Sequence, residues 1–470
     1  MVSSEVSPWA KSGGLADVVG ALPAALAGLG HAVGVVVPRY MHARDAPAER
    51  VITSLPVQLG TATYDVGIWQ MSTGSVTTYF VENAGLYGRD GLYGDRNGDY
   101  GDNHIRFALL AKAAIEISRL LFHADIFHGH DWQAGLVPVY LKIFAAVDPN
   151  FLHVKTVTTI HNLGYRGIFS PGKMGEISLP PWLLRPDLLE FWGELSLLKA
   201  GLVYSDALTT VSRKYAEEIQ TPEYGFGMDG LLRARRASLT GIVNGVDYTR
   251  WNPETDTAIP AHYSDTDLAG KQVCKRELLR ETGLPEAAME RPLLGIVSRF
   301  AGQKGFDLIA DIAWELFEDE VSLVVLGNGE TRYEDMFRSL AYHLPGKVAL
   351  RIGYDDALAH RIEAGADIFL MPSHYEPCGL NQIYSLRYGT VPVVRATGGL
   401  DDTIHEETGF KFTDYNGRAL LNTIRRACVA WHDRDAWTSM MVRGMQQDFS
   451  WAASAGEYSR LYSSLHPSAA

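Results

Sequence analysis

The stretch "RPLLGIVSRFAGQKGFDLI" (Arg291–Ile309) contains the unit from which the fold is expected to be built. Its first ten residues are mostly apolar and are typical of a strand that is buried on both faces. The run ends at a loop with two glycines, and a helix is expected to follow. Strands that alternate with helices in this way form parallel sheets whose two faces are covered by helices.

Apolar runs of the same type recur in two series along the chain. The first series comprises Gly30–Tyr40, Ala124–Asp131, Val154–Asn162 and Ser205–Ser212. The second series comprises Arg291–Phe300, Val321–Gly329, Lys347–Tyr354, Ala366–Ser373 and Thr390–Gly399. Helical stretches such as Arg106–Leu121 lie between the runs, and Asn244–Asp256, rich in Gly, Pro, Asn and Asp, separates the two series. The sequence therefore predicts an α/β protein with two doubly wound domains.

Composition agrees with this organisation, because 470 residues are too many for one hydrophobic core. The chain has 42 Lys and Arg against 55 Asp and Glu, and the net charge of −13 argues against a general affinity for nucleic acid or anionic membranes. Cys274, Cys378 and Cys428 are scattered and odd in number, so we expect neither a disulfide framework nor a metal cluster, and a reducing compartment is favoured. No apolar run reaches the length of a membrane span, and no secretory or transit segment is expected at the start.

Cations and glycines gather where strands are expected to end. Arg299 and Lys304 follow a strand and suit a diphosphate, to which arginine offers a fork of donors and lysine a point charge. The alternative is a solvated pair of cations. The segment "KSGG" (Lys11–Gly14) precedes a helix, and its glycines would let backbone N–H groups approach an anion, although a helix cap at Ser12 is an alternative. The lysine precedes the glycines, so this is no Walker A loop, and without GxGxxG a nicotinamide cofactor is not favoured.

Other strand ends carry carboxylate and imidazole side chains. Glu376 precedes an expected helix, where it can bind sugar hydroxyls and stabilise positive charge at a reacting carbon, or merely satisfy helix N–H groups. His161 follows the apolar run "VTTI" and is either structural or part of a site. His128 and His130 flank Gly129 and would share one face of a strand, as metal ligands can. No third ligand lies at a recognisable spacing, so no metal site is predicted.

Taken together, six segments resemble the signature segments of bacterial glycogen synthases and plant starch synthases. In order from about Ser3 to Thr403 they are "SSEVSPWAKSGGLADVVGALP", "HGHDWQAGL", "TIHNLGYRG", "NGVDYTRWNP", "SRFAGQKGFDLI" and "PSHYEPCGLNQIYSLRYGTVPVVRATGGLDDT". The resemblance implies a retaining glucosyltransferase of the GT-B architecture, in which two Rossmann-like domains face a central cleft. Bacterial members of the family use ADP-glucose to extend α-1,4-glucan chains at the non-reducing end.

The resemblance also implies the limits of the domains. Residues 1–245 would form the N-terminal, acceptor-side domain, which carries the Lys11 loop, and residues 246–449 would form the donor-binding domain. The amphipathic stretch Phe449–Leu465 indicates a final helix, within residues 450–470, that would cross back to complete the first domain. The first strand would begin at Met1–Val2, a shorter start than family members have.

The site residues implied by the resemblance fall into three groups. Those expected to bind the donor, with the Tyr354 ring stacked on adenine, are Lys11, Gly13, Gly14, Arg299, Lys304, Gly327, Tyr354, Glu376, Cys378, Gly379, Leu380 and Thr397. Those expected to bind the acceptor are Asp17, Asn103 and Asn244. Those expected to take part in catalysis are Glu376, His161, Arg299, Lys304 and Asp131. The usual KTGGL of the family is KSGGL here, and because Ser12 keeps the hydroxyl group we expect activity to survive.

The implied mechanism uses no metal or other cofactor. Arg299 and Lys304 would neutralise the charge that grows on the departing ADP, and its phosphate would take the proton of the acceptor. ADP-glucose and an α-1,4-glucan are the expected partners, with no nucleic acid and no membrane, and the oligomeric state is open. A bacterial cytoplasm is expected, or the plastid stroma for a mature plastid enzyme. Two alternatives remain, a glucan synthase that uses UDP-glucose and an inactive glucan-binding scaffold.

Overall fold

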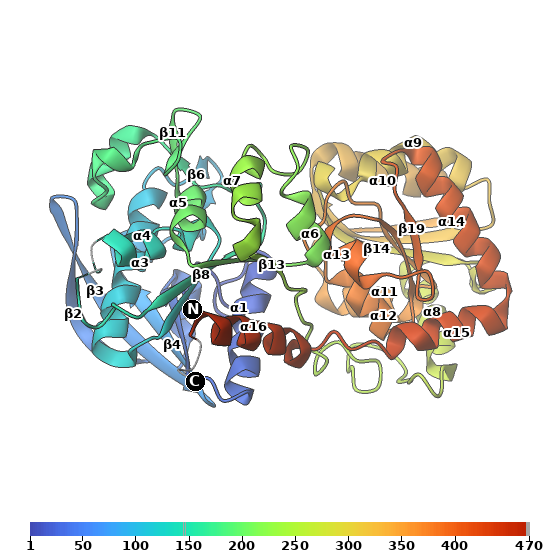
Figure 1. Cartoon of the computed structure of the whole chain (residues 1–470). Coiled ribbons are helices and arrows are strands. Elements are labelled where there is room, and N and C mark those ends of the chain that lie inside the picture. Colours follow the sequence, from blue (N-terminus) through green and yellow to red (C-terminus); the bar gives the residue numbers. More distant parts are fainter. Residues whose placement is uncertain (144, 146, 467–470) are drawn as a thin grey trace. The chain divides into compact units, whose positions relative to one another are not determined.

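The computed structural model describes residues 1–143, 145 and 147–466. The chain forms two compact units (Figure 1). Unit 1 comprises Met1–Val211, Ala216–Gly245 and the chain from Trp451 onward, and unit 2 comprises Ser212–Tyr215 and Val246–Ser450. Of the helices within the described ranges, none is both long and apolar enough to span a membrane.

Unit 1 contains a mixed sheet in two halves. One half has the order β1-β4-β3-β2, with β1 and β4 parallel and the other pairs antiparallel. The other half has the order β13-β12-β8-β7, with every pair parallel. Val2 joins the halves, since it bridges to Val36 of β1 and to Gly129 of β7. The strands are β1 (Val33–Pro38), β2 (Glu49–Leu59), β3 (Ala62–Thr73), β4 (Val76–Glu82), β7 (Ile126–His130), β8 (Lys155–Ile160), β12 (Ala207–Thr210) and β13 (Leu239–Gly241).

Helices and two small sheets complete unit 1. The apolar faces of α1 and α16 share one core cluster, to which α1 contributes Leu22 and Leu26 and α16 contributes Ala455 and Tyr458. The last helix of the chain is thereby tied to its first helix. The helices are α1 (Gly14–Gly28), α2 (Ala84–Tyr87), α3 (Asn103–Ile117), α4 (Val137–Ile143), α5 (Leu197–Tyr204), α7 (Asp229–Ala234) and α16 (Trp451–Leu465), while α6 (Arg213–Glu218) crosses the boundary between the units. The small sheets consist of β5 (Gly94–Asp95) with β6 (Gly98–Asp99), and of β9 (Ile168–Phe169), β10 (Glu190–Phe191) and β11 (Glu194–Ser196).

Unit 2 is a doubly wound domain around one six-stranded parallel sheet. Its strand order is β16-β15-β14-β17-β18-β19, so the direction of winding reverses between β14 and β17. In sheets of this type ligands bind beyond the carboxyl ends of the strands at the reversal. The strands are β14 (Leu293–Phe300), β15 (Ser322–Gly329), β16 (Val348–Ile352), β17 (Ile368–Met371), β18 (Val391–Arg395) and β19 (Phe410–Phe412).

The helices of unit 2 cover both faces of this sheet and form two cores. One core joins the strands to α9, α10 and α14, and the other joins them to α8 and α11. Local sequence explains α14, because the Asn416 side chain caps its start by accepting from the N–H of Ala419 and its apolar residues recur at helical spacing. The helices are α8 (Ala269–Thr282), α9 (Phe306–Leu316), α10 (Thr331–His343), α11 (Asp356–Gly365), α12 (Asn381–Arg387), α13 (Gly398–Thr403), α14 (Gly417–His432) and α15 (Arg434–Met445).

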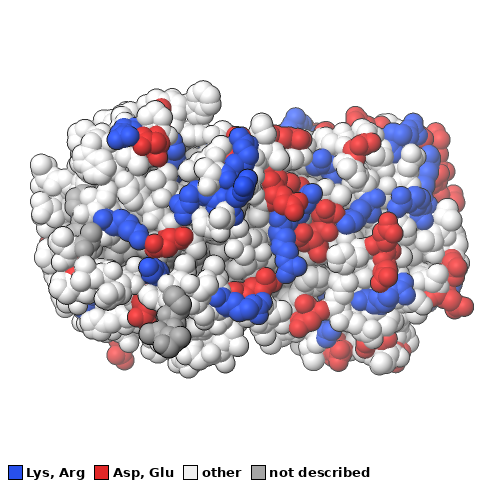
Figure 2. Space-filling model, viewed as in Figure 1, with Lys and Arg blue, Asp and Glu red and all other residues white. Residues whose placement is uncertain are grey.

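The predicted α/β architecture is confirmed, and each of the nine apolar runs named above contains a strand. Among the strands of the main sheets, β2, β3, β4, β13 and β19 were not predicted. Most residues of β2 are exposed or half-buried, so its sequence has no continuous apolar run from which a strand could be predicted. Acidic and basic side chains are interspersed over much of the face drawn in Figure 2, in keeping with the modest acidic excess of the sequence.

A buried ion pair links a helix of unit 2 to the edge of its central strands. Lys275 of α8 donates to the carboxylate of Asp367 at 2.7 Å, and both side chains are almost fully buried. Lys275 also donates to the carbonyl of Arg291, and the carboxylate of Asp367 also accepts from the N–H of Leu293 at 2.8 Å. The charges are therefore compensated by hydrogen bonds, as a buried pair requires.

Replacing Lys275 by Met should destabilise unit 2 by about 3–5 kcal/mol, because the Asp367 carboxylate would stay buried without its cation. The measurement is native-state hydrogen exchange of the β14 amides. Arg276→Met is the matched control, since the neighbouring Arg276 makes, among the described residues, only an exposed contact of 3.9 Å with Glu286. The control should change the opening free energy by less than about 0.5 kcal/mol. Equal effects of the two substitutions would contradict the role given to the buried pair.

Candidate active site

A cation and a carboxylate meet at the winding reversal of unit 2. Lys304 lies in the turn after β14, Glu376 lies in the loop after β17, and Nζ of Lys304 is 2.5 Å from Oε2 of Glu376. The hydroxyl of Ser373 donates to the same carboxylate oxygen at 3.1 Å. Glu376 is buried and Lys304 is half-buried. Two residues that are 72 positions apart in the sequence thus form one charged pair at the edge where ligands bind in such sheets.

Backbone contacts hold the two loops of this pair together. The N–H of His374 donates to the carbonyl of Gln303 at 2.8 Å, and the side chain of Gln303 donates to the carbonyl of Tyr375 at 3.1 Å. Gly305 adopts φ +73°, and a Cβ there would lie 2.0 Å from the carbonyl oxygen of Pro372. Only glycine fits this close crossing in this conformation. The position of Lys304 beside the Glu376 loop is therefore enforced by the backbone.

The loop before α13 supports Glu376 from another side. The N–H of Gly399 donates to the carbonyl of Glu376 at 3.1 Å, and a Cβ on Gly398 (φ +46°) would lie 1.9 Å from that oxygen. Thr397, directly before these glycines, is buried. Gly398 and Gly399 thus pack against the backbone of the Glu376 loop.

The helix that follows Glu376 does not use its side chain as a cap. The helix α12 begins at Asn381, and Leu380 stands at the cap position without a side-chain cap. Cys378 is buried, and Gly379 adopts φ +70° between Glu376 and the helix. The Glu376 carboxylate instead accepts from Lys304 and Ser373, so the structure does not support the alternative in which it only caps this helix.

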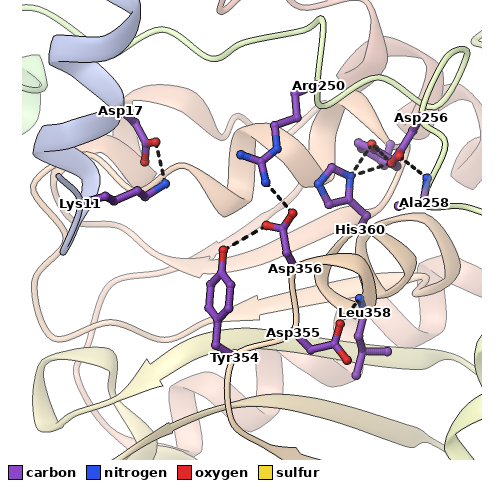
Figure 3. Close-up of polar contacts among 11 residues, drawn as sticks. Lys11, Asp17, Arg250, Asp256, Ala258, Tyr354, Asp355, Asp356, Leu358 and His360 are labelled. Carbon is purple, nitrogen blue, oxygen red and sulfur yellow. Dashed lines mark hydrogen bonds and ion pairs between the residues drawn. The ribbon is translucent and has the colours of Figure 1, made fainter. Parts of the chain in front are cut away.

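Other predicted donor residues lie along the same strand ends. Arg299 is exposed at the end of β14, and its guanidinium makes no hydrogen bond or ion pair with any described residue. Gly327 lies in β15, paired with Ser298 of β14. Tyr354 follows β16, its side chain is 85% exposed, and its hydroxyl donates to Asp356 at 3.2 Å (Figure 3). The exposed ring of Tyr354 offers a flat surface for stacking.

In unit 1 the Lys11 loop is shaped by a buried carboxylate. The side chain of Lys11 donates to Asp17 of α1 at 2.6 Å (Figure 3). Both the N–H and the hydroxyl of Ser12 donate to the carboxylate of Glu5 at 2.6 Å, and the N–H of Gly13 donates to it at 3.3 Å. The helix cap expected as an alternative at Ser12 is wrong, because Gly13 holds the cap position and Ser12 bonds to Glu5 instead.

Sequence reasoning missed Glu5, because nothing in the short segment around it marks this carboxylate as buried. This residue is only 3% exposed. The hydroxyl of Tyr93 also donates to it at 2.5 Å. The hydroxyl of Ser12 donates to Glu5, and threonine, the usual residue of the family at this position, carries the same hydroxyl group.

The two glycines of this loop are not required by the rest of the chain. A Cβ on Gly13 or on Gly14 would meet no described atom within 4 Å. The backbone of Gly13 has φ −161°, which any residue adopts, and Gly14 is the first residue of α1. The N–H of Gly14 donates to no described residue. Space and an available N–H group at the start of a helix suit the approach of an anionic ligand.

At the ends of β7 and β8, Asp131 and His161 are joined through the backbone. The carboxylate of Asp131 accepts from the N–H of His161 at 2.7 Å. Asp131 is buried with φ +55°, a conformation that is strained for a residue other than glycine and that is found preferentially at functional sites. Burial raises the pKa of Asp131 to about 7 and lowers the pKa of His161 to about 3. His161 itself is half-buried.

The rings of His128 and His130 lie on one face of β7, as their spacing predicted, and stack with their centres 4.4 Å apart. His128 bonds to the hydroxyls of Tyr462 and Thr159. His130 bonds through Nδ1 to Nε2 of His161 at 3.0 Å. Among the described residues no group of three or more His, Cys, Asp or Glu side chains is arranged to hold a metal ion.

The two asparagines predicted to bind the acceptor differ in their surroundings. Asn244 is 6% exposed, and its Oδ1 has no hydrogen-bond partner among the described residues. Asn103 is buried, donates to the carbonyl of Tyr93 at 2.8 Å and accepts from Arg106 at 2.6 Å. Asn244 therefore keeps a buried oxygen without a partner among the described residues, whereas the Asn103 amide is committed to unit 1 itself.

The comparisons with known proteins cover both units. The family model for the starch synthase catalytic domain matches residues 1–234, and that for glycosyl transferases group 1 matches residues 284–439. The glycogen synthase of Koribacter versatilis (strain Ellin345) is 51% identical over 473 residues, which cover 98% of this chain and 96% of the relative. The glycogen synthase of Anaeromyxobacter sp. (strain Fw109-5) is 50% identical over 472 residues, which cover 99% of this chain and 98% of the relative.

A solved structure gives the same result. The catalytic domain of starch synthase IV from Arabidopsis thaliana, bound to ADP and acarbose, matches with a TM-score of 0.89 at 31% identity. The match covers 99% of this chain and 98% of that chain. The chain therefore belongs to the glycogen and starch synthase family of glycosyltransferases.

Proposed function

We propose that the protein transfers glucose from ADP-glucose to the non-reducing end of an α-1,4-glucan with retention of configuration. Membership of the family supports this proposal, as does the likeness to a starch synthase structure that holds ADP and acarbose. The observation that carries it is the contact between Lys304 and Glu376. A lysine that binds the diphosphate of the donor would bring the adjoining glucose to the carboxylate beside it.

On the donor side, Arg299 and Lys304 would bind the diphosphate. The Arg299 guanidinium is exposed at the end of β14, so it can turn toward phosphate oxygens without breaking a bond to a described residue. Glu376 would accept hydrogen bonds from the glucose hydroxyls, and the ring of Tyr354 would stack on adenine. Backbone groups near the nucleotide sugar would come from the remaining predicted donor residues, Gly327, Cys378, Gly379, Leu380 and Thr397.

Unit 1 would supply the other contacts. Lys11 and the backbone of Gly13 and Gly14 would meet the donor, and His161 would contact the transferred glucose. The acceptor glucan would be bound by Asp17 and Asn244, of which Asn244 offers a buried carbonyl oxygen that needs a donor. Asn103 has the weakest support, because its side chain is already bonded within the unit.

The proposed mechanism uses charge neutralisation rather than a protein base. As the bond between the anomeric carbon and the diphosphate breaks, Arg299 and Lys304 would offset the negative charge on the leaving group. Glu376 would offset the positive charge that develops on the sugar, and the departing phosphate would take the proton of the acceptor hydroxyl. We propose that no metal ion or other cofactor takes part, because two cations already lie at the strand ends that would receive the diphosphate.

The bacterial relatives also support a location, which we propose is the cytoplasm of a bacterial cell. ADP, ADP-glucose and an α-1,4-glucan would be the partners there.

The direct test of the proposed function is incubation with radiolabelled ADP-glucose and glycogen. Label should enter the polymer, and kcat/KM for ADP-glucose should exceed that for UDP-glucose by at least about tenfold, a ratio that corresponds to about 1.4 kcal/mol of transition-state binding. Faster transfer from UDP-glucose would overturn the donor assignment. Binding of glycogen without incorporation from either donor would favour the inactive scaffold.

The contact between Lys304 and Glu376 predicts coupled kinetic effects. Lys304→Ala and Glu376→Gln should each lower kcat/KM by about a hundredfold, the cost of losing one group that acts on transition-state charge. The double variant should lose much less than the product of the two effects, since each substitution already disrupts the same pair. Glu376→Gln should leave the dissociation constant of ADP within about threefold, because Glu376 itself would contact the glucose, which ADP lacks, and the variant keeps Lys304 to bind the diphosphate.

Glu281→Gln serves as the control for this cycle, since Glu281 pairs with Arg361 in the same unit at 2.7 Å and outside the candidate site. It should keep the activity of the parent protein. Fully multiplicative effects of Lys304→Ala and Glu376→Gln would contradict the coupling, and an unaffected Glu376→Gln variant would remove Glu376 from the mechanism.

The open space at Gly14 separates a ligand role from a structural one. Gly14→Ala should leave the protein as stable as the parent or raise its stability by up to about 1 kcal/mol, because alanine favours helix and the new Cβ meets no atom. The same Cβ would hold the donor off the backbone, so kcat/KM should fall by about tenfold or more, equivalent to about 1.4 kcal/mol. Thermal unfolding and initial rates measure the two effects.

Gly28→Ala is the matched control for this experiment. Gly28 is the last residue of the same helix, and a Cβ there would also meet no described atom within 4 Å. Gly28→Ala should leave kcat/KM unchanged and should change stability only by the small gain expected when alanine replaces glycine in a helix. Full activity of Gly14→Ala would show that no ligand approaches this backbone.

A further inference from the structure

The contact between His130 and His161 restricts where the proton of His161 can be. Nδ1 of His130 lies 3.0 Å from Nε2 of His161, within hydrogen-bond distance. Burial lowers the pKa of both imidazoles, that of His130 well below its usual value, so both rings are neutral near pH 7. A neutral imidazole has one N–H donor and one bare nitrogen. One ring must therefore donate to the other, and the choice decides which nitrogen of His161 carries its hydrogen.

The surroundings of His130 decide the direction of this bond. Its side chain is fully buried, and its Nε2 has no hydrogen-bond partner among the described residues. If Nε2 of His130 carried the hydrogen, a buried N–H group would have no acceptor, which is rare and costly in proteins. If Nε2 carries no hydrogen, only a lone pair lacks a partner. The hydrogen of His130 is therefore on Nδ1, and His130 donates to Nε2 of His161.

His161 is then bonded at its inner nitrogen and carries its hydrogen on Nδ1. None of the hydrogen bonds of the described residues involves this Nδ1, and the residue is half-buried, so it is not sealed inside the unit as His130 is. The carboxylate of Asp131 fixes the backbone of His161 through its N–H. Stacking of His128 on His130, with the planes 26° apart, holds the second ring.

We propose that His130 is a positioning residue that keeps His161 in the Nδ1–H form, so that His161 offers its ligand an N–H donor and not a lone pair. The identity of that ligand, an oxygen of the transferred glucose, rests on the proposed function. In this form His161 donates to a sugar oxygen and cannot take the proton of the acceptor hydroxyl at Nδ1. Another group must then accept the proton of the acceptor hydroxyl, which agrees with the proposal that the departing phosphate takes it.

The test of the tautomer is independent of activity. The full-length protein is labelled with ¹⁵N-histidine, and long-range ¹H–¹⁵N correlation spectra distinguish a protonated from a bare nitrogen in each ring. The signals of His161 and His130 are assigned by their disappearance in His161→Gln and His130→Asn. We expect a protonated Nδ1 and a bare Nε2 for both residues in the parent protein. A protonated Nε2 on His161 would overturn the proposal.

Two substitutions of His130 test its positioning role. In His130→Asn the amide nitrogen stands where Nδ1 stood and can still donate to His161, while His130→Leu fills the space without a donor. We expect the leucine variant to give a mixture of His161 tautomers and to lower kcat about tenfold with KM for the glucan within about twofold. We expect the asparagine variant to recover the Nδ1–H form and most of kcat. Equal behaviour of the two variants would contradict the role of the donated hydrogen bond.

Tyr462→Phe is the control, because the Tyr462 hydroxyl bonds to His128 and makes no contact with His161. It should change neither the His161 signals nor kcat. Failure of the proposed function remains distinguishable. If the parent protein shows the expected tautomer but transfers no glucose, the inference about His130 stands and the assignment of the ligand falls.

Discussion

The ion pair between Lys304 and Glu376 is the interaction on which the site of unit 2 depends. It exists because the winding of the sheet reverses between β14 and β17, which brings the loops after these strands together. Gly305 lets one loop cross the backbone of the other, and Gly398 and Gly399 close the far side of Glu376. Any residue with a Cβ at one of these three glycine positions would push the loops apart and separate the cation from the carboxylate. The backbone geometry and the proposed chemistry therefore depend on the same residues.

Buried carboxylates in unit 1 organise the backbone of the site. Glu5 accepts hydrogen bonds from Ser12, Gly13 and Tyr93, and Asp131 accepts one from the N–H of His161. Each of these two carboxylates fixes the conformation of the loop to which it bonds. The side chains of that loop are therefore positioned before a ligand binds. The hydrogen bond between His130 and His161 acts in a similar way on a proton. It decides whether the free nitrogen of His161 presents an N–H group or a lone pair to a ligand.

The glycines of the chain divide into two kinds that composition cannot separate. Gly305 and Gly398 are required by the fold, since a Cβ would fall about 2 Å from a backbone oxygen at Pro372 or Glu376. Gly13 and Gly14 are not required by any described neighbour. A glycine that the fold does not need, at the start of a helix and beside a lysine, has its best explanation in a ligand that must come close.

The sequence by itself determined the α/β class and five of the six strands of unit 2, because buried parallel strands are continuous apolar runs, and it pointed to candidate residues in the loops after them. It did not reveal the strands β2, β3, β4, β13 and β19, the role of Glu5 or the bond between His130 and His161. Only the tertiary structure decided that Ser12 bonds to Glu5 instead of capping α1, and that Glu376 pairs with Lys304 instead of capping α12. The physical reason is that a side chain takes the best partner within reach, and a partner 72 residues away becomes a neighbour only when the sheet has formed.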